Sequence, residues 1–287
     1  MKSETSKMAF AMALLFSFLF CGIPVQSAKA QFLGSVYISS DGSVAGTNAI
    51  QRNGSIYTLT ANISGGIQVQ KSSIVIDGAG YTVQGNGVGR GLDLSNGVGE
   101  NPSRSVISNV TLKNLRIVGF GFGVETNGGG NHTFYRNYIA NCSEDCIRLI
   151  ACSYNTITYC TIEDGTVSMA YSANYNTVTK SNLLNSSVMV WLSGYEIVDS
   201  DYWSDYLTKY PNAKEIGNTG AWDTPYNYGD LTDNHPLMKP VSIPISELPN
   251  GKGEPESFPT LLVVAVAITI VVAVAVGLTV YLKKTKR

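Results

Sequence analysis

The feature that most constrains the fold is a short sequence pattern that recurs about every 22 residues through the middle of the chain. In each repeat, polar residues precede one apolar residue, and a second apolar residue follows five positions later. These two positions are held by Leu112 and Ile117, Phe134 and Ile139, Ile157 and Ile162, and Val178 and Leu183. A turn rich in Asn, Gly or Ser then leads to a third apolar segment. Each repeat therefore holds three short apolar segments separated by turns.

Which residues of the third segment point inward is less certain, because the sequence defines their positions only to within about one residue. A short strand supplies one or two inward side chains, because successive residues point to opposite faces. We expect the inward residues to be Val124, Ile147 with Leu149, Val167 with Met169, and Val190 with Leu192.

The repeat length decides between classes of solenoid. Helical solenoids need about 33 or more residues per repeat and show a period of about 3.6 residues. Leucine-rich repeats have a similar length, but this chain lacks their L-x-x-L-x-L frame. Three short strands match one coil of a three-sided parallel β-helix, in which coils stack about 4.8 Å apart. We therefore predict an all-β fold, a right-handed parallel β-helix, with Asn favoured in its turns.

Segments on both sides of the repeats complete the predicted organisation. Residues 74–83 match an earlier coil, and the aromatic, turn-rich sequence after Leu192 predicts a cap, because the end coils of a β-helix expose strand edges. The predicted divisions are a signal peptide at 1–30, an N-terminal β cap at 31–70, the parallel β-helix at 71–198, a C-terminal cap at 199–240, a Pro- and Gly-containing stalk at 241–259, a transmembrane helix at 260–282 and a basic tail at 283–287.

The N-terminus has the features of an export signal. Lys2 and Lys7 precede the apolar run 8–23, and the small residues Ala28 and Ala30 offer a cleavage site, so we expect cleavage after Ala30. The alternative is a retained N-terminal anchor, but the run is short for a membrane span.

The C-terminus predicts a membrane anchor. Leu261 to Leu282 is an apolar run, and at about 1.5 Å per residue it would cross about 30 Å of hydrocarbon as a helix. Four basic residues follow it and indicate a cytoplasmic end. A buried core helix is the alternative. We predict a single-pass protein of the cell membrane with an extracellular ectodomain and a cytoplasmic C-terminus.

Several segments resemble a known family. They are Ser73 to Gly85, the N-T-I-T and N-T-V-T starts at Asn155 and Asn176, Asp201 to Tyr206, Trp222 to Tyr226, and Asp233 to Leu237. Together they resemble archaeal β-helix proteins of the NosD type, in the group named for carbohydrate binding and sugar hydrolysis (CASH). The resemblance implies the β-helix fold. It does not imply one activity, because the group includes binders, hydrolases and metal-delivery proteins. Tyr154, Tyr175, Cys152 and Cys160 depart from the group's usual Ser and Asn.

Four carboxylates lie in turns of successive predicted coils: Glu144, Asp145, Glu163 and Asp164. Such a group can bind Ca²⁺, the only cofactor that the sequence suggests, or supply the acid and base of a glycosidase. Arg148 follows in the next strand and could stabilise a uronate charge in a lyase. Solvated turn residues are the simpler interpretation. No calcium-binding repeat and no catalytic motif is recognisable.

Tyrosines occupy equivalent positions in consecutive repeats. Tyr154 precedes Asn155, Tyr175 precedes Asn176, and Tyr159 lies nearby. A strip of aromatic rings on a flat face can bind sugar rings, and it can also stack on itself to stabilise the coil. Both interpretations stay open.

Four cysteines follow the predicted signal peptide: Cys142, Cys146, Cys152 and Cys160. An even number in an exported chain favours disulfides, with Cys142–Cys146 and Cys152–Cys160 as one arrangement. Buried thiols inside the coils are the alternative.

The composition narrows the function. A formal net charge of −1 with 14% charged residues gives no basic surface for nucleic acid. Copper delivery needs clustered His, Met or Cys ligands, but His132 and His235 lie far apart in sequence and Met169 and Met189 match core positions. We predict a non-catalytic surface module that binds extracellular or envelope glycan, or has a structural or adhesive role. A polysaccharide lyase or glycoside hydrolase on the same scaffold is the alternative, and a copper-delivery protein is a distant third. The sequence does not indicate the oligomeric state.

Overall fold

The computed structural model describes residues 36–95 and 105–243. Predicted cleavage after Ala30 and the predicted membrane helix from Leu261 to Leu282 lie outside the described residues, as does most of the predicted stalk. Within the described ranges, no helix is long and apolar enough to cross a membrane.

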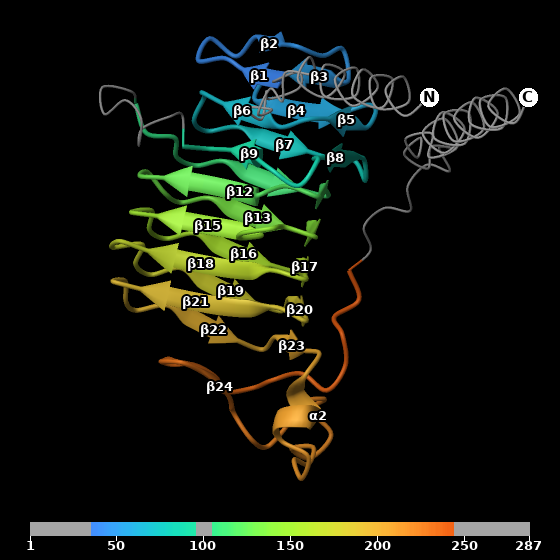
Figure 1. The fold of residues 1–287 in the computed structure, drawn as a ribbon, viewed down its shortest axis with the longest axis vertical. Helices are drawn as coiled ribbons and strands as arrows, with labels where there is room; N and C mark the ends of the chain where they lie inside the picture. The colour runs from blue at the N-terminus through green and yellow to red at the C-terminus, as the bar shows by residue number, and fades with distance from the viewer. Residues whose placement is uncertain (1–35, 96–104, 244–287) are drawn as a thin grey trace, which may run out of the picture. The chain divides into compact units, whose positions relative to one another are not determined.

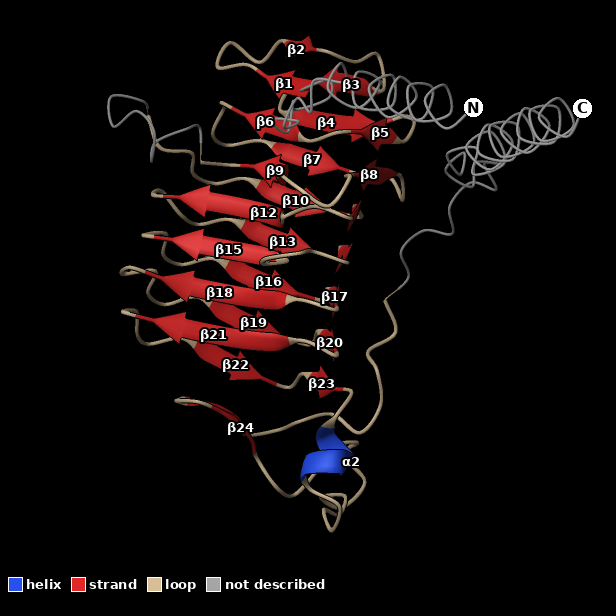
Figure 2. Ribbon diagram, in the orientation of Figure 1, coloured by secondary structure: helices blue, strands red, loops and turns tan. Residues whose placement is uncertain are grey.

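Three sheets of mostly parallel strands wind around a common core (Figures 1 and 2). Sheet A contains, in spatial order, β2 (Val44–Ala45), β1 (Val36–Ile38), β6 (Ile67–Val69), β9 (Arg90–Asp93), β12 (Phe122–Asn127), β15 (Ile147–Ile150), β18 (Thr166–Ala170) and β21 (Ser187–Trp191). Sheet B contains β22 (Ile197–Asp199), β19 (Thr177–Thr179), β16 (Thr156–Thr158), β13 (Thr133–Tyr135), β10 (Thr111–Lys113), β7 (Val75–Asp77), β4 (Ile56–Leu59) and β3 (Ile50–Asn53). Sheet C contains β23 (Tyr202–Trp203), β20 (Asn182–Leu184), β17 (Thr161–Glu163), β14 (Tyr138–Ala140), β11 (Arg116–Val118), β8 (Thr82–Gln84) and β5 (Ile63–Ser64).

Each coil takes one strand from sheet B, one from sheet C and one from sheet A, in that order along the chain. The first complete coil is β4–β5–β6 and the last is β19–β20–β21, which makes six coils, and β22 and β23 begin another. The predicted β-helix is therefore confirmed. The first coil begins at Ile56, within the stretch 31–70 that the sequence assigned to the N-terminal cap.

The predicted apolar positions of sheets B and C are paired as the repeat requires. Leu112 lies opposite Phe134, Phe134 opposite Ile157 and Ile157 opposite Val178. The equivalent row of sheet C is Ile117, Ile139, Ile162 and Leu183. These side chains are buried, and each large one contributes about 1.5–3 kcal/mol relative to an exposed position. β-Branched residues suit such rows because they pack well on a pleated surface.

The third segment of the last coil differs from the prediction. Val188 lies opposite Val167 and Val190 opposite Met169, so the expected pair of Val190 and Leu192 is wrong by two residues. The turn before sheet A has six residues between β14 and β15 but two before β18 and two before β21, so Val188 follows Leu183 at the same spacing as Val167 follows Ile162. Leu192 is consequently 65% exposed.

The same register corrects the assignment of Met189 to the core. Met169 faces inward and is buried, whereas Met189 lies opposite Ser168, faces outward and is 52% exposed.

Two rows of polar side chains, most of them buried, run along the corners of the β-helix. The sheet B ladder consists of His132, Asn155, Asn176 and Glu196. His132 Nδ1 accepts from the Val110 backbone N–H (3.3 Å), and Asn155 accepts from that of His132 (2.8 Å). Asn176 accepts from Asn155 N–H (2.9 Å), and Glu196 accepts from Asn176 N–H (2.5 Å). Each corner N–H is thereby satisfied by the next coil, as buried donors require.

The sheet C ladder consists of Asn137, Cys160, Ser181 and Asp201. Asn137 accepts from Leu115 N–H (3.0 Å), Ser181 from Cys160 N–H (3.2 Å) and Asp201 from Ser181 N–H (2.7 Å). Both ladders end in a carboxyl group. Among the described residues, Glu196 Oε1 and Asp201 Oδ2 are buried oxygens without a hydrogen-bond partner.

Caps cover the two ends of the coil stack. At the N-terminal end, β2 and β3 pair antiparallel with β1 and β4. At the C-terminal end, the cap contains α2 (Tyr206–Lys209) and the antiparallel strands β24 (Tyr226–Tyr228) and β25 (Leu231–Asp233). Its apolar centre is aromatic, because the rings of Trp203 and Tyr226 stack 4.0 Å apart.

Candidate functional site

Three tyrosines stack along the corner that joins sheet A to sheet B. Tyr154, Tyr175 and Tyr195 come from successive coils, and we call them the tyrosine ladder. The ring centroids of Tyr154 and Tyr175 lie 5.2 Å apart with planes 3° from parallel, and those of Tyr175 and Tyr195 lie 4.9 Å apart and 8° from parallel. Their exposed fractions are 60%, 47% and 77%. The ladder is therefore an ordered aromatic surface in contact with solvent.

The backbone explains why these tyrosines point outward. Each one directly precedes a member of the sheet B ladder, and each has a left-handed φ of 62°, 59° or 63° in chain order. This conformation is uncommon for residues with a Cβ and persists only where surrounding contacts hold it. Here two kinds of contact hold the turn in this conformation: the hydrogen bonds of the ladder residue that follows each tyrosine, and the stacking between the tyrosine rings.

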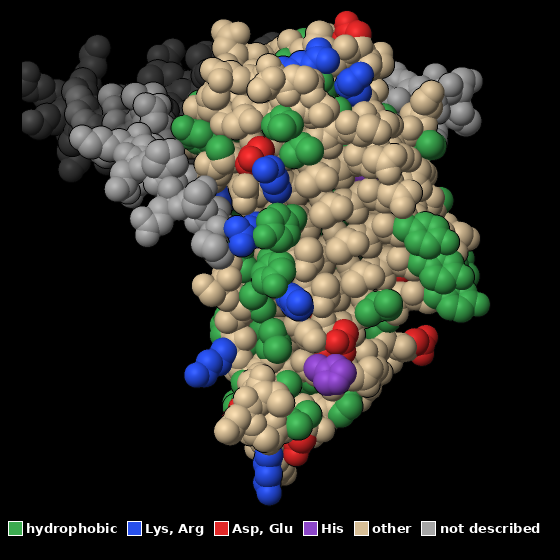
Figure 3. Space-filling model, turned by 180° about the vertical axis from the view of Figure 1, so that it is seen from behind, with side chains coloured by type: hydrophobic (Ala, Val, Ile, Leu, Met, Phe, Trp, Pro, Cys, Tyr) green, Lys and Arg blue, Asp and Glu red, His purple; other side chains and the backbone are tan. Residues whose placement is uncertain are grey.

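A second aromatic pair adjoins the ladder at the same corner. Tyr171 follows β18 and Trp191 ends β21, and their rings meet edge to face with centroids 4.6 Å apart. Trp191 is 53% exposed. We call Tyr154, Tyr171, Tyr175, Trp191 and Tyr195 together the aromatic corner. Figure 3 shows hydrophobic side chains stacked at the right-hand edge of the molecule, where the strands of sheet A end. Exposed patches of this kind mark interaction sites.

The ring geometry limits how the aromatic corner can contact a ligand. Tyr175 has another tyrosine ring against each of its faces, so its faces are not open to a sugar. The edges of the ladder rings and the exposed surface of Trp191 remain. This arrangement offers apolar contact beside a row of phenolic hydroxyls, which act as donors and acceptors.

Of the three tyrosines predicted to bind carbohydrate, the structure brings only Tyr154 and Tyr175 together. Tyr159 lies at the corner between sheets B and C, where its ring meets Tyr135 edge to face at 5.9 Å. Lys180 Nζ lies 6.0 Å from the centroid of the Tyr159 ring. Tyr195 belongs to the ladder and was missed, although it lies about one coil beyond Tyr175.

The four predicted carboxylates have separate environments. Asp145 accepts from Ser168 Oγ (2.8 Å) and lies 3.9 Å from Arg148, and its burial raises its pKa. Glu163 accepts from the Tyr138 hydroxyl (2.6 Å), and Asp164 accepts from Asn185 Nδ2 (2.7 Å). Glu144 is exposed. Within residues 36–95 and 105–243, no three His, Cys, Asp or Glu side chains are placed to hold a metal ion. The calcium site stays a prediction.

One of these carboxylates lines a pocket between the last two coils and the C-terminal cap. The pocket has a volume of about 450 Å³, and its walls include Asp164, Thr166, Asn185, Ser187, Asp205 and Tyr228. Asp205 accepts from the hydroxyl of Tyr226 at 3.0 and 2.9 Å. Burial is the main cause that raises the pKa of Tyr226, so its hydroxyl stays a donor. None of the described residues that line the pocket is Lys or Arg.

The four cysteines are buried free thiols in the structure. Cys160 Sγ donates to the Phe134 carbonyl (3.4 Å), and burial raises the pKa of Cys160 to about 12. Cys152 Sγ accepts from Asn155 Nδ2 (3.1 Å). A hydrogen bond between Cys142 and Cys146 lowers the pKa of Cys142 and raises that of Cys146. Disulfide pairing of the four stays a prediction.

Comparison with known proteins identifies the family of this chain. The family model described as right-handed β-helix region matches residues 36–201, which include all six coils. The chain belongs to this family. No curated protein and no solved structure matches the chain.

Proposed function

We propose that this chain is a non-catalytic carbohydrate-binding module of the cell surface, and that the aromatic corner is its binding site. The β-helix fold of the family is consistent with a carbohydrate-binding or structural role. The observation that carries the proposal is the row of five exposed aromatic side chains along one corner of the β-helix. They come from turns and strand ends of successive coils. Sugars bind such surfaces through apolar ring contacts and through hydrogen bonds to their hydroxyls.

The placement at the cell surface rests on the sequence. It requires the export signal cleaved after Ala30 and the membrane helix from Leu261 to Leu282. The resemblance to archaeal NosD-type proteins supports an extracellular or envelope glycan as the partner. A self-stacking ladder with a purely structural role is the competing interpretation.

Binding to a glycan array tests the proposal. The full chain, purified in detergent, is compared with a triple variant, Tyr154→Ala with Tyr175→Ala and Tyr195→Ala. The control is Tyr37→Ala, which removes an exposed tyrosine on β1, outside the aromatic corner. We expect the wild type and the control to be retained on a common set of glycans, and the triple variant to lose at least tenfold in binding. Equal retention of all three proteins would refute the aromatic corner as the site.

A parallel assay addresses the enzymatic alternative. The same protein is incubated with a polysaccharide panel while reducing ends and unsaturated uronate absorbance are followed. We expect no turnover, since no catalytic motif is recognisable and the carboxylates Glu144, Asp145, Glu163 and Asp164 have separate environments. Turnover would replace the binding module with a lyase or hydrolase.

A further inference from the structure

The pocket beside the C-terminal cap and the aromatic corner lie at the two ends of one strand. β21 begins at Ser187, which lines the pocket, and ends at Trp191, which belongs to the aromatic corner. Ser187 and Trp191 are four residues apart, which is roughly 13 Å at about 3.3 Å per residue. The two sites are therefore close enough for one extended ligand to reach both.

The outer face of sheet A connects the pocket with the aromatic corner. Ser187, Met189 and Trp191 are alternate residues of β21, so their side chains point to the same side, while Val188 points into the core. Met189 and Trp191 are 52% and 53% exposed. The outer surface of β21 is thus an open apolar track that leads from the pocket to the aromatic corner.

The polar groups of the pocket suit a ligand that carries hydroxyl groups. The carboxylates of Asp164 and Asp205 each accept one internal donor, from Asn185 and from Tyr226, and an ionised carboxylate has about four acceptor positions. The hydroxyls of Thr166 and Ser187 lie 3.0 Å apart and offer a further donor and acceptor. Tyr228 adds an aromatic wall.

The charge of the pocket restricts the class of ligand. Two carboxylates line it, and none of its described wall residues is basic. One cation, Lys209 Nζ, lies behind this lining, 4.1 Å from the centroid of the Tyr226 ring and 6.0 Å from that of Tyr228, so the carboxylates outnumber it. The carboxylates repel the negative charge of an acidic sugar. They accept hydrogen bonds from hydroxyl and ammonium groups.

We propose that this pocket holds the terminal unit of a non-acidic oligosaccharide, neutral or bearing an amino group, whose chain runs along the outer face of β21 to the aromatic corner. This inference rests on the proposed carbohydrate-binding function. It adds a direction, a required length and a charge preference to that binding site.

The test measures binding of oligomers of one to six units of glucose, of glucosamine and of galacturonic acid to the full chain in detergent. Calorimetry gives the affinity, and quenching of tryptophan fluorescence reports contact at Trp191, with Trp191→Phe as the spectroscopic control. A host without N-glycosylation leaves the Asn185-Ser186-Ser187 acceptor sequence of the pocket unmodified. We expect the affinity for glucose or glucosamine oligomers to rise at least tenfold with length and then level off, and galacturonate oligomers to bind at least tenfold more weakly.

Two pocket variants make the proposal falsifiable. Ser187→Trp fills the pocket and should lower the affinity for the longest oligomer at least tenfold, to that of a short one. Asp164→Asn with Asp205→Asn keeps the shape of both side chains and should raise galacturonate binding at least fivefold. The matched control, Asp41→Asn with Glu144→Gln, removes the same charge at exposed positions away from the pocket. Thermal melts establish that each variant is folded.

The outcomes separate this inference from the proposed function. Wild-type affinities in both pocket variants, together with loss of binding in the tyrosine triple variant, would refute the pocket and the track but leave the aromatic corner as the site. Absence of binding of every oligomer and of every arrayed glycan to the wild type would overturn both.

Discussion

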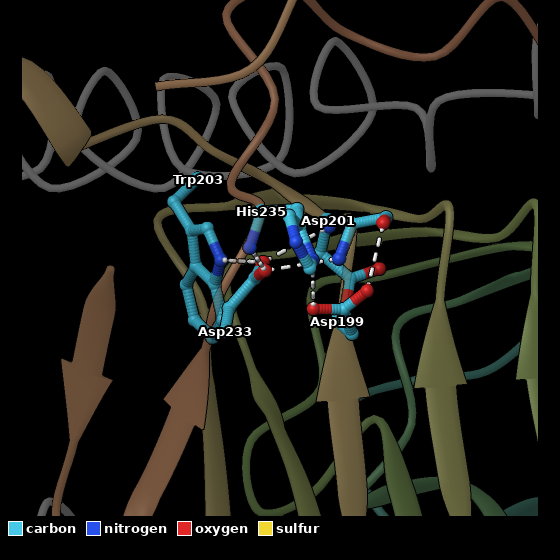
Figure 4. A network of polar contacts seen from close by, with 6 residues as sticks. Asp199, Asp201, Trp203, Asp233 and His235 are labelled. Atoms are coloured by element: carbon cyan, nitrogen blue, oxygen red, sulfur yellow. Dashed lines mark hydrogen bonds and ion pairs between the residues drawn. The ribbon is translucent and has the colours of Figure 1, made fainter. Parts of the chain in front are cut away.

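Trp203 Nε1 donates a hydrogen bond to Asp233 Oδ2 at 3.0 Å, and both side chains are buried. The same oxygen accepts from Asp201 N–H (3.0 Å), at the end of the sheet C ladder. Asp233 Oδ1 accepts from the backbone N–H groups of Ser200 (2.9 Å) and His235 (3.0 Å). Figure 4 shows these contacts converging on Asp233. One carboxylate of β25 thus joins the C-terminal cap to the last winding of the β-helix.

We predict that Asp233→Ala destabilises the protein by about 2–4 kcal/mol, because it leaves four N–H donors without their acceptor in a buried site. Urea unfolding followed by tryptophan fluorescence measures the change in the free energy of unfolding. Asp230→Ala, at an exposed position of the same hairpin, is the control and should change stability by less than about 0.5 kcal/mol. Equal stabilities of the two variants would show that Asp233 does not secure the cap.

The carboxyl group at the end of the sheet B ladder should make stability depend on pH. Burial raises the pKa of Glu196 from 4.5 to about 7. A carboxyl whose pKa is higher in the folded than in the unfolded state binds more protons when folded, so its contribution to stability falls as pH rises between those two values.

We therefore expect Glu196→Gln to gain about 1 kcal/mol over the wild type between pH 4.5 and pH 8, a value reduced for the partial exposure of the side chain. Urea unfolding at four pH values in this range measures the difference. Parallel stability curves for the two proteins would contradict the assignment.

The left-handed backbone of the tyrosine ladder predicts an unusual order of glycine and alanine. Tyr175 has a φ of 59°, where a residue with a Cβ is strained and glycine is not. We expect both Tyr175→Ala and Tyr175→Gly to lose the two ring contacts, but Tyr175→Gly to be more stable than Tyr175→Ala by about 0.5–1 kcal/mol. Thermal and urea unfolding measure the order. If alanine were the better residue, the positive φ of this turn would be wrong.

The buried amides of the sheet B ladder should be sensitive to substitution. Asn155 accepts from the His132 N–H, and its Nδ2 donates to the Cys152 carbonyl (3.0 Å) and to Asn176 Oδ1 (2.7 Å). Asn155→Ala leaves a buried N–H unsatisfied and opens a void, so we predict a loss of about 2–4 kcal/mol. Asn174→Ala, in a neighbouring turn and less buried, should lose less. Similar losses in the two variants would argue against the ladder.

The regular part of this fold follows from the sequence because each coil repeats the same spacing. The distance from Leu112 to Ile117 recurs in every later coil, so the cores of sheets B and C are predictable. The spacing before sheet A changes, since the turn before β15 is longer than the turns before β18 and β21. Counting from Ile147 therefore misplaces Val188, whereas counting from Val167 across the equal turns gives its position.

Features that do not repeat were harder to predict. Tyr195 is followed by Glu196, whereas Tyr154 and Tyr175 are followed by asparagine, so the Tyr-Asn signature ends one coil before the tyrosine ladder does. Asp205 and Tyr228 of the pocket come from the cap, where no period applies. Only the folded chain places them beside Asp164.

The most direct test of carbohydrate binding at the aromatic corner is a crystal structure of the protein with a glycan selected on the array. We predict sugar rings in contact with Trp191 and with the edges of the tyrosine ladder. A glycan bound on another face, with Trp191 and Tyr175 free of contacts, would contradict the account.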